Sequence, residues 1–340
     1  MTDHPSTHLT GRPTTRRPAR PPRRRGALRA LAGAAAVVAG LVALPAPVAL
    51  AACPAGDQCT SLPDVDVQKV VLAATLDPWR TDDVKTPGAA TSVLRVEQAL
   101  VAKGLLASRY ADGYWGTTTT TAWGKYEKSI GQNGIHTRNG LPSPAELRKI
   151  GAGRFDVVRS YDVGARVTVA KAPAGNSDDG TEVVNRRTLD MFLEAQRNLV
   201  RADKVGKDMT ITQGSYCDAS CAPESFGTHD GGGIIDVRIV DTTAAGIANR
   251  LAALRAVGFA AWQRSNHIHA VALNDYQMAW AVHGVGGAPA PIVDDGWTGY
   301  CQVYEWVYKG DGLGHCDGRV ASTSAQRTVV TWEDYLAARG

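Results

Sequence analysis

Two short segments decide how this chain is interpreted: SFGTHDGGGIID at residues 225–236 and NHIH at residues 266–269. The first is a glycine-rich turn, where backbone can approach closely, followed by an apolar run that predicts a strand. In the second, His267 and His269 stand two residues apart on an expected strand, so their side chains point to the same face. The two segments can therefore bring three imidazoles and one carboxylate together.

These side chains have the chemistry of a zinc site. A catalytic zinc takes three protein ligands from His, Asp or Glu and leaves one position open. The segments offer one group more than that, and the spare group can serve as a base. Each residue alone has an ordinary structural interpretation, because single His side chains are commonly hydrogen-bonded and Asp often forms turns. Three of the six His that follow residue 52 nevertheless fall in these segments, which favours a metal site: His136, His229, His267, His269, His283 and His315.

The sequence around the two segments predicts a mixed fold from Phe155 onward. Period-two apolar runs predict strands, and longer amphipathic stretches predict helices. The strands are expected at 157–158, 167–169, 209–212, 234–240 and 268–273, and the helices at 188–199 and 243–257. Because strands and helices do not alternate strictly, an α+β fold is expected.

The two segments resemble the zinc peptidases related to D-alanyl-D-alanine carboxypeptidases and murein endopeptidases, which share a fold with the hedgehog signalling domain. The motifs of that family are His-x6-Asp, here His229 to Asp236, and a Glu or His shortly before a ligand His. The resemblance covers about residues 155–285 and implies a small antiparallel sheet with flanking helices. It also implies Zn²⁺ bound by His229, Asp236 and His269, with His267 as the catalytic base.

One departure from the family concerns substrate binding. Many relatives carry an Arg-Ser pair before the first motif, where the Arg holds a substrate carboxylate bidentately. Here the corresponding stretch supplies Gln213, Ser215 and Tyr216 as candidate substrate-binding residues. The missing Arg could be replaced by one of three others, which are Arg187, Arg238 and Arg264. Gly227 also stands where the family usually has Ser.

A helical module is expected at residues 90–151. Val93, Val96 and Leu100 recur at helical spacing, and Gly104 marks a helix end. The stretch resembles the three-helix peptidoglycan-binding domain of bacterial wall hydrolases at Leu94, Gln98, Leu100, Gly104, Asp112, Gly113, Trp115, Gly116, Thr121, Ala122, Trp123 and Tyr126. Trp115 replaces a Phe and Trp123 a small apolar residue. The resemblance implies peptidoglycan as the partner; a helical spacer is the structural alternative.

Residues 1–52 are expected to be a signal peptide. Basic residues lead into an uncharged stretch, 30–44, and small residues follow at 49–52. That stretch is shorter than the ~20 residues a transmembrane helix needs. Arg24-Arg25 resembles a twin-arginine signal, and an ordinary secretion signal remains the alternative. Residues 53–89 are interpreted as a linker containing one apolar run, Val67 to Leu76.

The charge and the cysteines fit an exported protein. Residues 1–52 carry eight Arg and one Asp, a charge of +7, while the whole chain carries +4, so the remainder carries −3. This gives no support for nucleic-acid binding. Six cysteines follow the signal in three close pairs, which predicts disulfides, although six allow 15 connectivities. Residues 50–53 also resemble a lipoprotein cleavage site, so a membrane anchor is expected only if Cys53 is lipidated.

Together these features predict an exported zinc metallopeptidase, secreted or attached to the cell wall. It would act on peptide bonds of peptidoglycan stem peptides or cross-links, as a D,D- or L,D-carboxypeptidase or endopeptidase. A catalytically silent zinc-containing wall-binding protein is the first alternative. An envelope structural protein, whose disulfide-stapled tail binds a partner, is the second. The sequence leaves the bond cleaved, the oligomeric state and the role of a C-terminal extension, 286–340, open.

Overall fold

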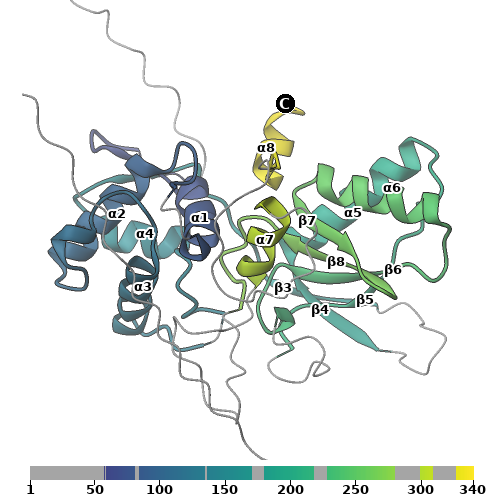
Figure 1. Cartoon of the computed structure of the whole chain (residues 1–340), viewed down its shortest axis with the longest axis horizontal. Coiled ribbons are helices and arrows are strands. Elements are labelled where there is room, and N and C mark those ends of the chain that lie inside the picture. The colour runs from purple at the N-terminus through teal and green to yellow at the C-terminus, as the bar shows by residue number, and fades with distance from the viewer. Residues whose placement is uncertain are drawn as a thin grey trace, which may run out of the picture. The chain divides into compact units, whose positions relative to one another are not determined.

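The structure of the protein is a computed structural model. It describes residues 57, 59–80, 84–134, 136–170, 180–217, 228–279, 299–308 and 327–340. The expected signal peptide and Cys53 lie outside these residues. Within the described part, eight α-helices accompany small parallel and antiparallel sheets, which confirms the α+β class (Figure 1). None of the described helices combines the length and apolar character that crossing a bilayer requires.

Four helices build the N-terminal half: α1 (Val67–Leu76), α2 (Ala90–Ala102), α3 (Thr117–Ser129) and α4 (Pro144–Gly151). Helices α2 to α4 lie where the three-helix module was expected. Ser143 begins α4 with a capping box, in which its side chain and that of Glu146 each accept a bond from the other's backbone N–H. Gly113 turns the chain between α2 and α3 at φ +81°, and an added Cβ would lie 2.7 Å from the carbonyl oxygen of Ala90.

The two tryptophans that depart from the wall-binding pattern are both core residues. Trp115 and Trp123 are fully buried, with ring centroids 5.8 Å apart. Trp123 also contacts Tyr126 edge-on at 5.1 Å. Trp115 and Trp123 therefore pack against each other in the core, since tilted aromatic pairs pack favourably at these distances.

The stretch at 53–89, which was expected to be a linker, contains a strand and the helix α1. Strand β1 (Asp64–Asp66) pairs in parallel with β2 (Asp156–Val158), and α1 follows it directly. Asp66 caps α1 by accepting a bond from the backbone N–H of Lys69. The apolar run at 67–76 is almost wholly buried against the other helices, because a ten-residue apolar helix is stable only when its faces are covered.

The C-terminal half is built on a four-stranded antiparallel sheet in the order β5-β6-β8-β7. Its strands are β5 (Ile211–Gln213), β6 (Ile234–Arg238), β7 (Phe259–Gln263) and β8 (His267–Ala272). A separate hairpin pairs β3 (Arg166–Ala170) with β4 (Thr181–Asn185). The sequence did not predict β4 or β7, and alanines, which have low strand propensity, occupy the middle of β7.

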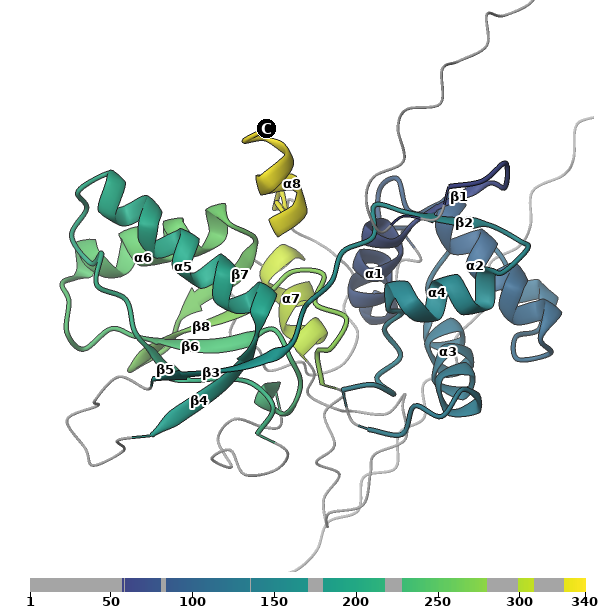
Figure 2. The same cartoon turned by 180° about the vertical axis from the view of Figure 1, so that it is seen from behind.

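Alternation along the strands divides this sheet into two faces. One face packs Ile235, Val237 and Ile268 against α5 (Arg186–Arg201) and α6 (Ala244–Ala256). Figure 2 shows these two helices beside the sheet from behind. The opposite face carries Asp236 and His269 between apolar neighbours. Helix α7 (Gly299–Tyr308) packs against β7, β8 and α1 and shares a core with that face.

The last described helix, α8 (Trp332–Ala337), is tied to α5 by a partly buried ion pair. Glu333 accepts two bonds from the guanidinium of Arg187, at 2.7 and 2.9 Å. Arg187 also donates to the carbonyl oxygen of Leu273 at the end of β8. The C-terminal extension thus contributes packing and polar contacts to the fold.

Candidate metal centre

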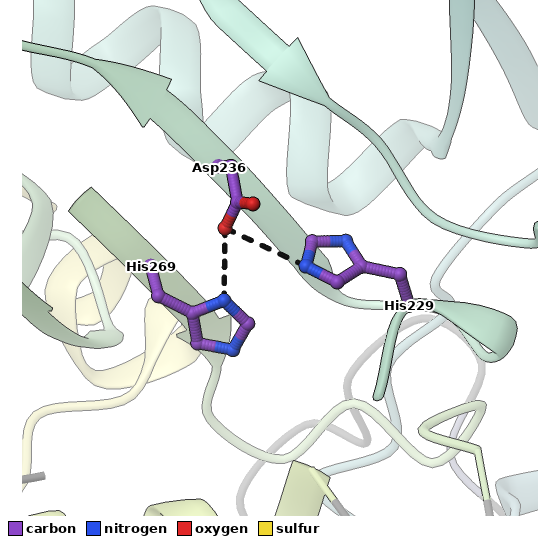
Figure 3. Close-up of side chains that lie close together, drawn as sticks. All are labelled: His229, Asp236 and His269. Carbon is purple, nitrogen blue, oxygen red and sulfur yellow. Dashed lines mark hydrogen bonds and ion pairs between the residues drawn. The ribbon is translucent and has the colours of Figure 1, made fainter. Parts of the chain in front are cut away.

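Three buried side chains from three separate segments form a group that could hold a metal ion. His229 lies on a short 3-10 turn, Thr228–Asp230, Asp236 on β6 and His269 on β8 (Figure 3). Their ligand-capable atoms all lie within 4.8 Å of one another. Asp236 and His269 are direct partners in the antiparallel register of β6 and β8, and therefore share one face of the sheet.

The carboxylate of Asp236 is the centre of this group. Its Oδ1 atom lies 2.8 Å from Nδ1 of His269 and 3.5 Å from Nε2 of His229. All three residues are buried, with exposed fractions of 1% for His229, 6% for Asp236 and 3% for His269. Groups of this polarity are buried only when they are paired or hold an ion.

The outer nitrogens of both imidazoles are held by oxygen acceptors. His229 Nδ1 lies 2.6 Å from the carbonyl oxygen of Gly214, and His269 Nε2 lies 2.9 Å from Oε1 of Gln302. Those oxygens can accept a hydrogen from the outer nitrogens. The inner nitrogens face Asp236, so each imidazole can present one nitrogen to the carboxylate while an acceptor holds the other. Ligand histidines of metal sites are held in this way, which makes the group a candidate metal site.

Burial and charge act in opposite directions on these groups. Burial by itself raises the pKa of Asp236, but the neighbouring His229 and His269 outweigh it and hold that pKa far below its usual range. Burial lowers the pKa of His229, yet the charge of Asp236 more than offsets this and raises it. For His269 burial dominates, and its pKa is lowered. Asp236 is therefore ionised at neutral pH.

His267 lies beside this group but is more open to solvent. Its side chain is 22% exposed, and its Nε2 lies 3.5 Å from Oδ1 of Asp236. Its Nδ1 lies 2.7 Å from Oδ1 of Asn266. Burial lowers the pKa of His267, which keeps its ring neutral at pH 7. It therefore has a nitrogen near the group together with access to water.

The three residues expected to bind substrate have different contacts. Gln213 is the register partner of Asp236 on the edge strand β5. Ser215 is buried, and its hydroxyl donates to the carbonyl oxygen of Ile234 and accepts from the N–H of that residue, which ties the loop to β6. Tyr216 adopts a positive φ of 63° and donates its hydroxyl to Gln277. The guanidinium of Arg166 lies 3.9 Å from its ring centroid.

Two of the three arginines proposed to replace the family's carboxylate-binding Arg lie near the group. Arg187 is buried in its pair with Glu333. Arg238 follows Asp236 by two residues on the same face of β6 and is the register partner of His267. Arg264 donates its backbone N–H to the carbonyl oxygen of His267, and its charge helps to lower the pKa of that residue.

Sequence reasoning missed two residues that contact His269. Trp262 is its register partner on β7, with ring centroids 5.0 Å apart. Gln302 comes from α7, in a region where the sequence offered no pattern, so no signal pointed to it. The two cysteines whose side chains are described, Cys59 and Cys217, are each disulfide-bonded. Cys217 also donates its backbone N–H to the carbonyl oxygen of His229.

No family model matches this chain, and no curated protein or solved structure matches it either. The proposed function therefore rests on the chemistry of the buried His-Asp-His group.

Proposed function

We propose that the protein is an exported zinc metallopeptidase that hydrolyses peptide bonds in peptidoglycan stem peptides or cross-links. One observation supports this above the others. The inner nitrogens of His229 and His269 face the ionised carboxylate of Asp236, while their outer nitrogens are held by acceptors. Two imidazoles and one carboxylate form a ligand set that zinc commonly takes in hydrolases, with a further position left for water or substrate.

Different residues of the site would perform different parts of amide hydrolysis. Zinc bound by His229, Asp236 and His269 would supply a polarised scissile carbonyl and an activated water at neutral pH. His267, with a pKa lowered by burial, would accept the proton of that water and return it to the leaving amine. Asn266 orients this ring by its contact with Nδ1.

Substrate recognition is assigned to the positive groups beside the metal centre. Arg238 lies on the same sheet face as Asp236, next to His267 across the strand pair. Its guanidinium lies 3.9 Å from a carboxylate oxygen of Asp241. A carboxylate of a stem peptide would pair with it bidentately. Gln213, on the edge strand, and Tyr216 offer polar groups nearby, and their role as substrate-binding residues stays a proposal.

The helical module is proposed to hold the enzyme on the wall. A hollow of about 320 Å³ lies on it between the segment that follows α2, at 105–110, and α3. Its lining combines apolar Leu105 and Leu106 with the polar residues Tyr110, Thr121 and Lys125. Such a mixture suits a glycan or peptide strand, since apolar and hydroxyl groups contact sugars together. Tethering would raise the local concentration of substrate.

Digestion of purified peptidoglycan tests the proposal. The mature chain should release fragments cut at an amide bond, which mass spectrometry identifies. A chelator should abolish the release and added zinc should restore it. Full-length Tyr110→Ala and Lys125→Glu variants should sediment less with insoluble wall yet retain zinc. Peptidoglycan that remains uncut in the presence of zinc-loaded protein would refute the peptidase assignment.

A catalytically silent zinc protein is the second candidate, and one distance favours it. Nε2 of His267 is as far from Oδ1 of Asp236 as Nε2 of His229 is, 3.5 Å in both cases. A fourth protein ligand would close the coordination sphere, as in structural zinc sites. Zinc loss on substitution of His267 separates this candidate from the enzyme.

A further inference from the structure

Gln302 reaches the candidate metal centre from a distant part of the chain. It lies on α7, 33 residues beyond His269, and is 2% exposed. Neighbouring α7 residues such as Val303 and Val307 are buried in the same core as Val271 on the site face of the sheet. Packing of α7 against β7 and β8 therefore sets the position of the Gln302 amide.

The contact determines which nitrogen of His269 is available to a metal. A neutral imidazole carries its proton on one ring nitrogen and a lone pair on the other. Oε1 of Gln302 lies 2.9 Å from Nε2 of His269, where it can accept a hydrogen from that nitrogen. Nδ1 lies 2.8 Å from Oδ1 of Asp236, within hydrogen-bonding distance. When a metal takes the lone pair of Nδ1, the proton of the neutral ring is on Nε2, and the Gln302 oxygen accepts it.

We propose that Gln302 is a positioning residue of the metal centre, which fixes His269 as a ligand through Nδ1. The assignment rests on the proposed function, because it presupposes that the group binds zinc. It gives α7 a chemical role: the C-terminal extension completes the hydrogen-bonding shell around the ligands. Gly214 does the same for His229. Both outer acceptors are neutral oxygens. Asp236 therefore supplies the only negative charge among the two imidazoles, the carboxylate and the two acceptors. A single negative charge would leave a bound zinc electrophilic.

Zinc affinity of the full mature chain tests this, measured by competition with a chromogenic chelator. Gln302→Leu keeps similar bulk but removes the acceptor, and should weaken binding by roughly 10–100-fold, as loss of such partners does. Gln302→Glu retains an acceptor and should bind zinc nearly as tightly as the wild type. Val307→Ala removes packing from the same helix without touching His269, and should also bind like the wild type.

Two outcomes would overturn the role of Gln302 while leaving the metal centre intact. One is wild-type affinity in Gln302→Leu; the other is an equal loss in Val307→Ala, which would show that helix packing alone matters. A wild-type chain that binds no zinc would instead refute the metal centre and this role together. Nitrogen-15 NMR of the zinc-loaded wild type needs no variant: His269 should carry its proton on Nε2, and a proton on Nδ1 would refute the assignment.

Discussion

His269 and Asp236 face each other across neighbouring antiparallel strands, with Nδ1 of the imidazole 2.8 Å from Oδ1 of the carboxylate. Both side chains are buried, and each is fixed by a strand whose opposite face packs on α5 and α6. The pair is therefore held rigidly, since neither strand can shift without exposing that core. A metal ion at this group would be bound by side chains that the fold already brings together.

Zinc content is the first prediction for this group. The purified mature chain should carry about one zinc per molecule. His269→Ala removes the ligand closest to Asp236 and should lose the metal, as measured by elemental mass spectrometry. His136→Ala is a matched control, because His136 contacts Arg166 and lies outside the group. Stoichiometric zinc in His269→Ala would disprove the ligand set.

His267→Ala separates the base from the ligands. A base contributes typically 10²–10⁴-fold to rate, and its loss should not empty the site. The variant should therefore keep its zinc and its fold but lose most hydrolysis of wall peptides. Near-normal turnover by the zinc-loaded variant would remove His267 from the mechanism. Loss of zinc would identify it as a fourth ligand and support the silent protein.

Glu97 in α2 gives a prediction about pH and stability. It is fully buried, accepts the N–H groups of Asp112 and Gly113 and the hydroxyl of Thr119, and burial raises its pKa to about 7. The folded chain thus binds a proton that the unfolded chain has released above its ordinary pKa of 4.5. Its stabilising contribution is complete below that value and is lost as the pH rises through about 7.

Glu97→Gln mimics the protonated side chain at every pH. Its free energy of unfolding should match the wild type near pH 4.5 and exceed it at pH 8, by an amount on the order of 3 kcal/mol. Urea unfolding at both pH values measures the difference. If the free energies of unfolding of variant and wild type differed by the same amount at both pH values, Glu97 could not be uncharged in the folded state at low pH.

The cysteines make a prediction about export. Three disulfides in the exported protein would lower its intact mass by six hydrogens relative to the reduced chain. Added acyl chains on Cys53 would identify a membrane-anchored lipoprotein. Peptide mapping under non-reducing conditions then shows whether the bridges join the three close pairs.

The local pattern of the sequence determined much of this protein. Helical spacing of Val93, Val96 and Leu100 predicted α2, and the apolar run after the glycines predicted β6. Two-residue spacing placed His267 and His269 on one face of a strand. These features depend on neighbours a few residues apart, where backbone geometry alone sets which side chains lie together.

The tertiary structure alone decided how the distant parts meet. The pairing of Asp236 with His269, the burial of α1 and the approach of Gln302 depend on strand register and helix packing across long stretches of chain. No short-range pattern encodes these contacts, because each depends on which apolar faces cover one another in the folded chain. The sequence thus named the chemical groups of the site, while packing of the sheet and α7 determined which nitrogen atoms face Asp236.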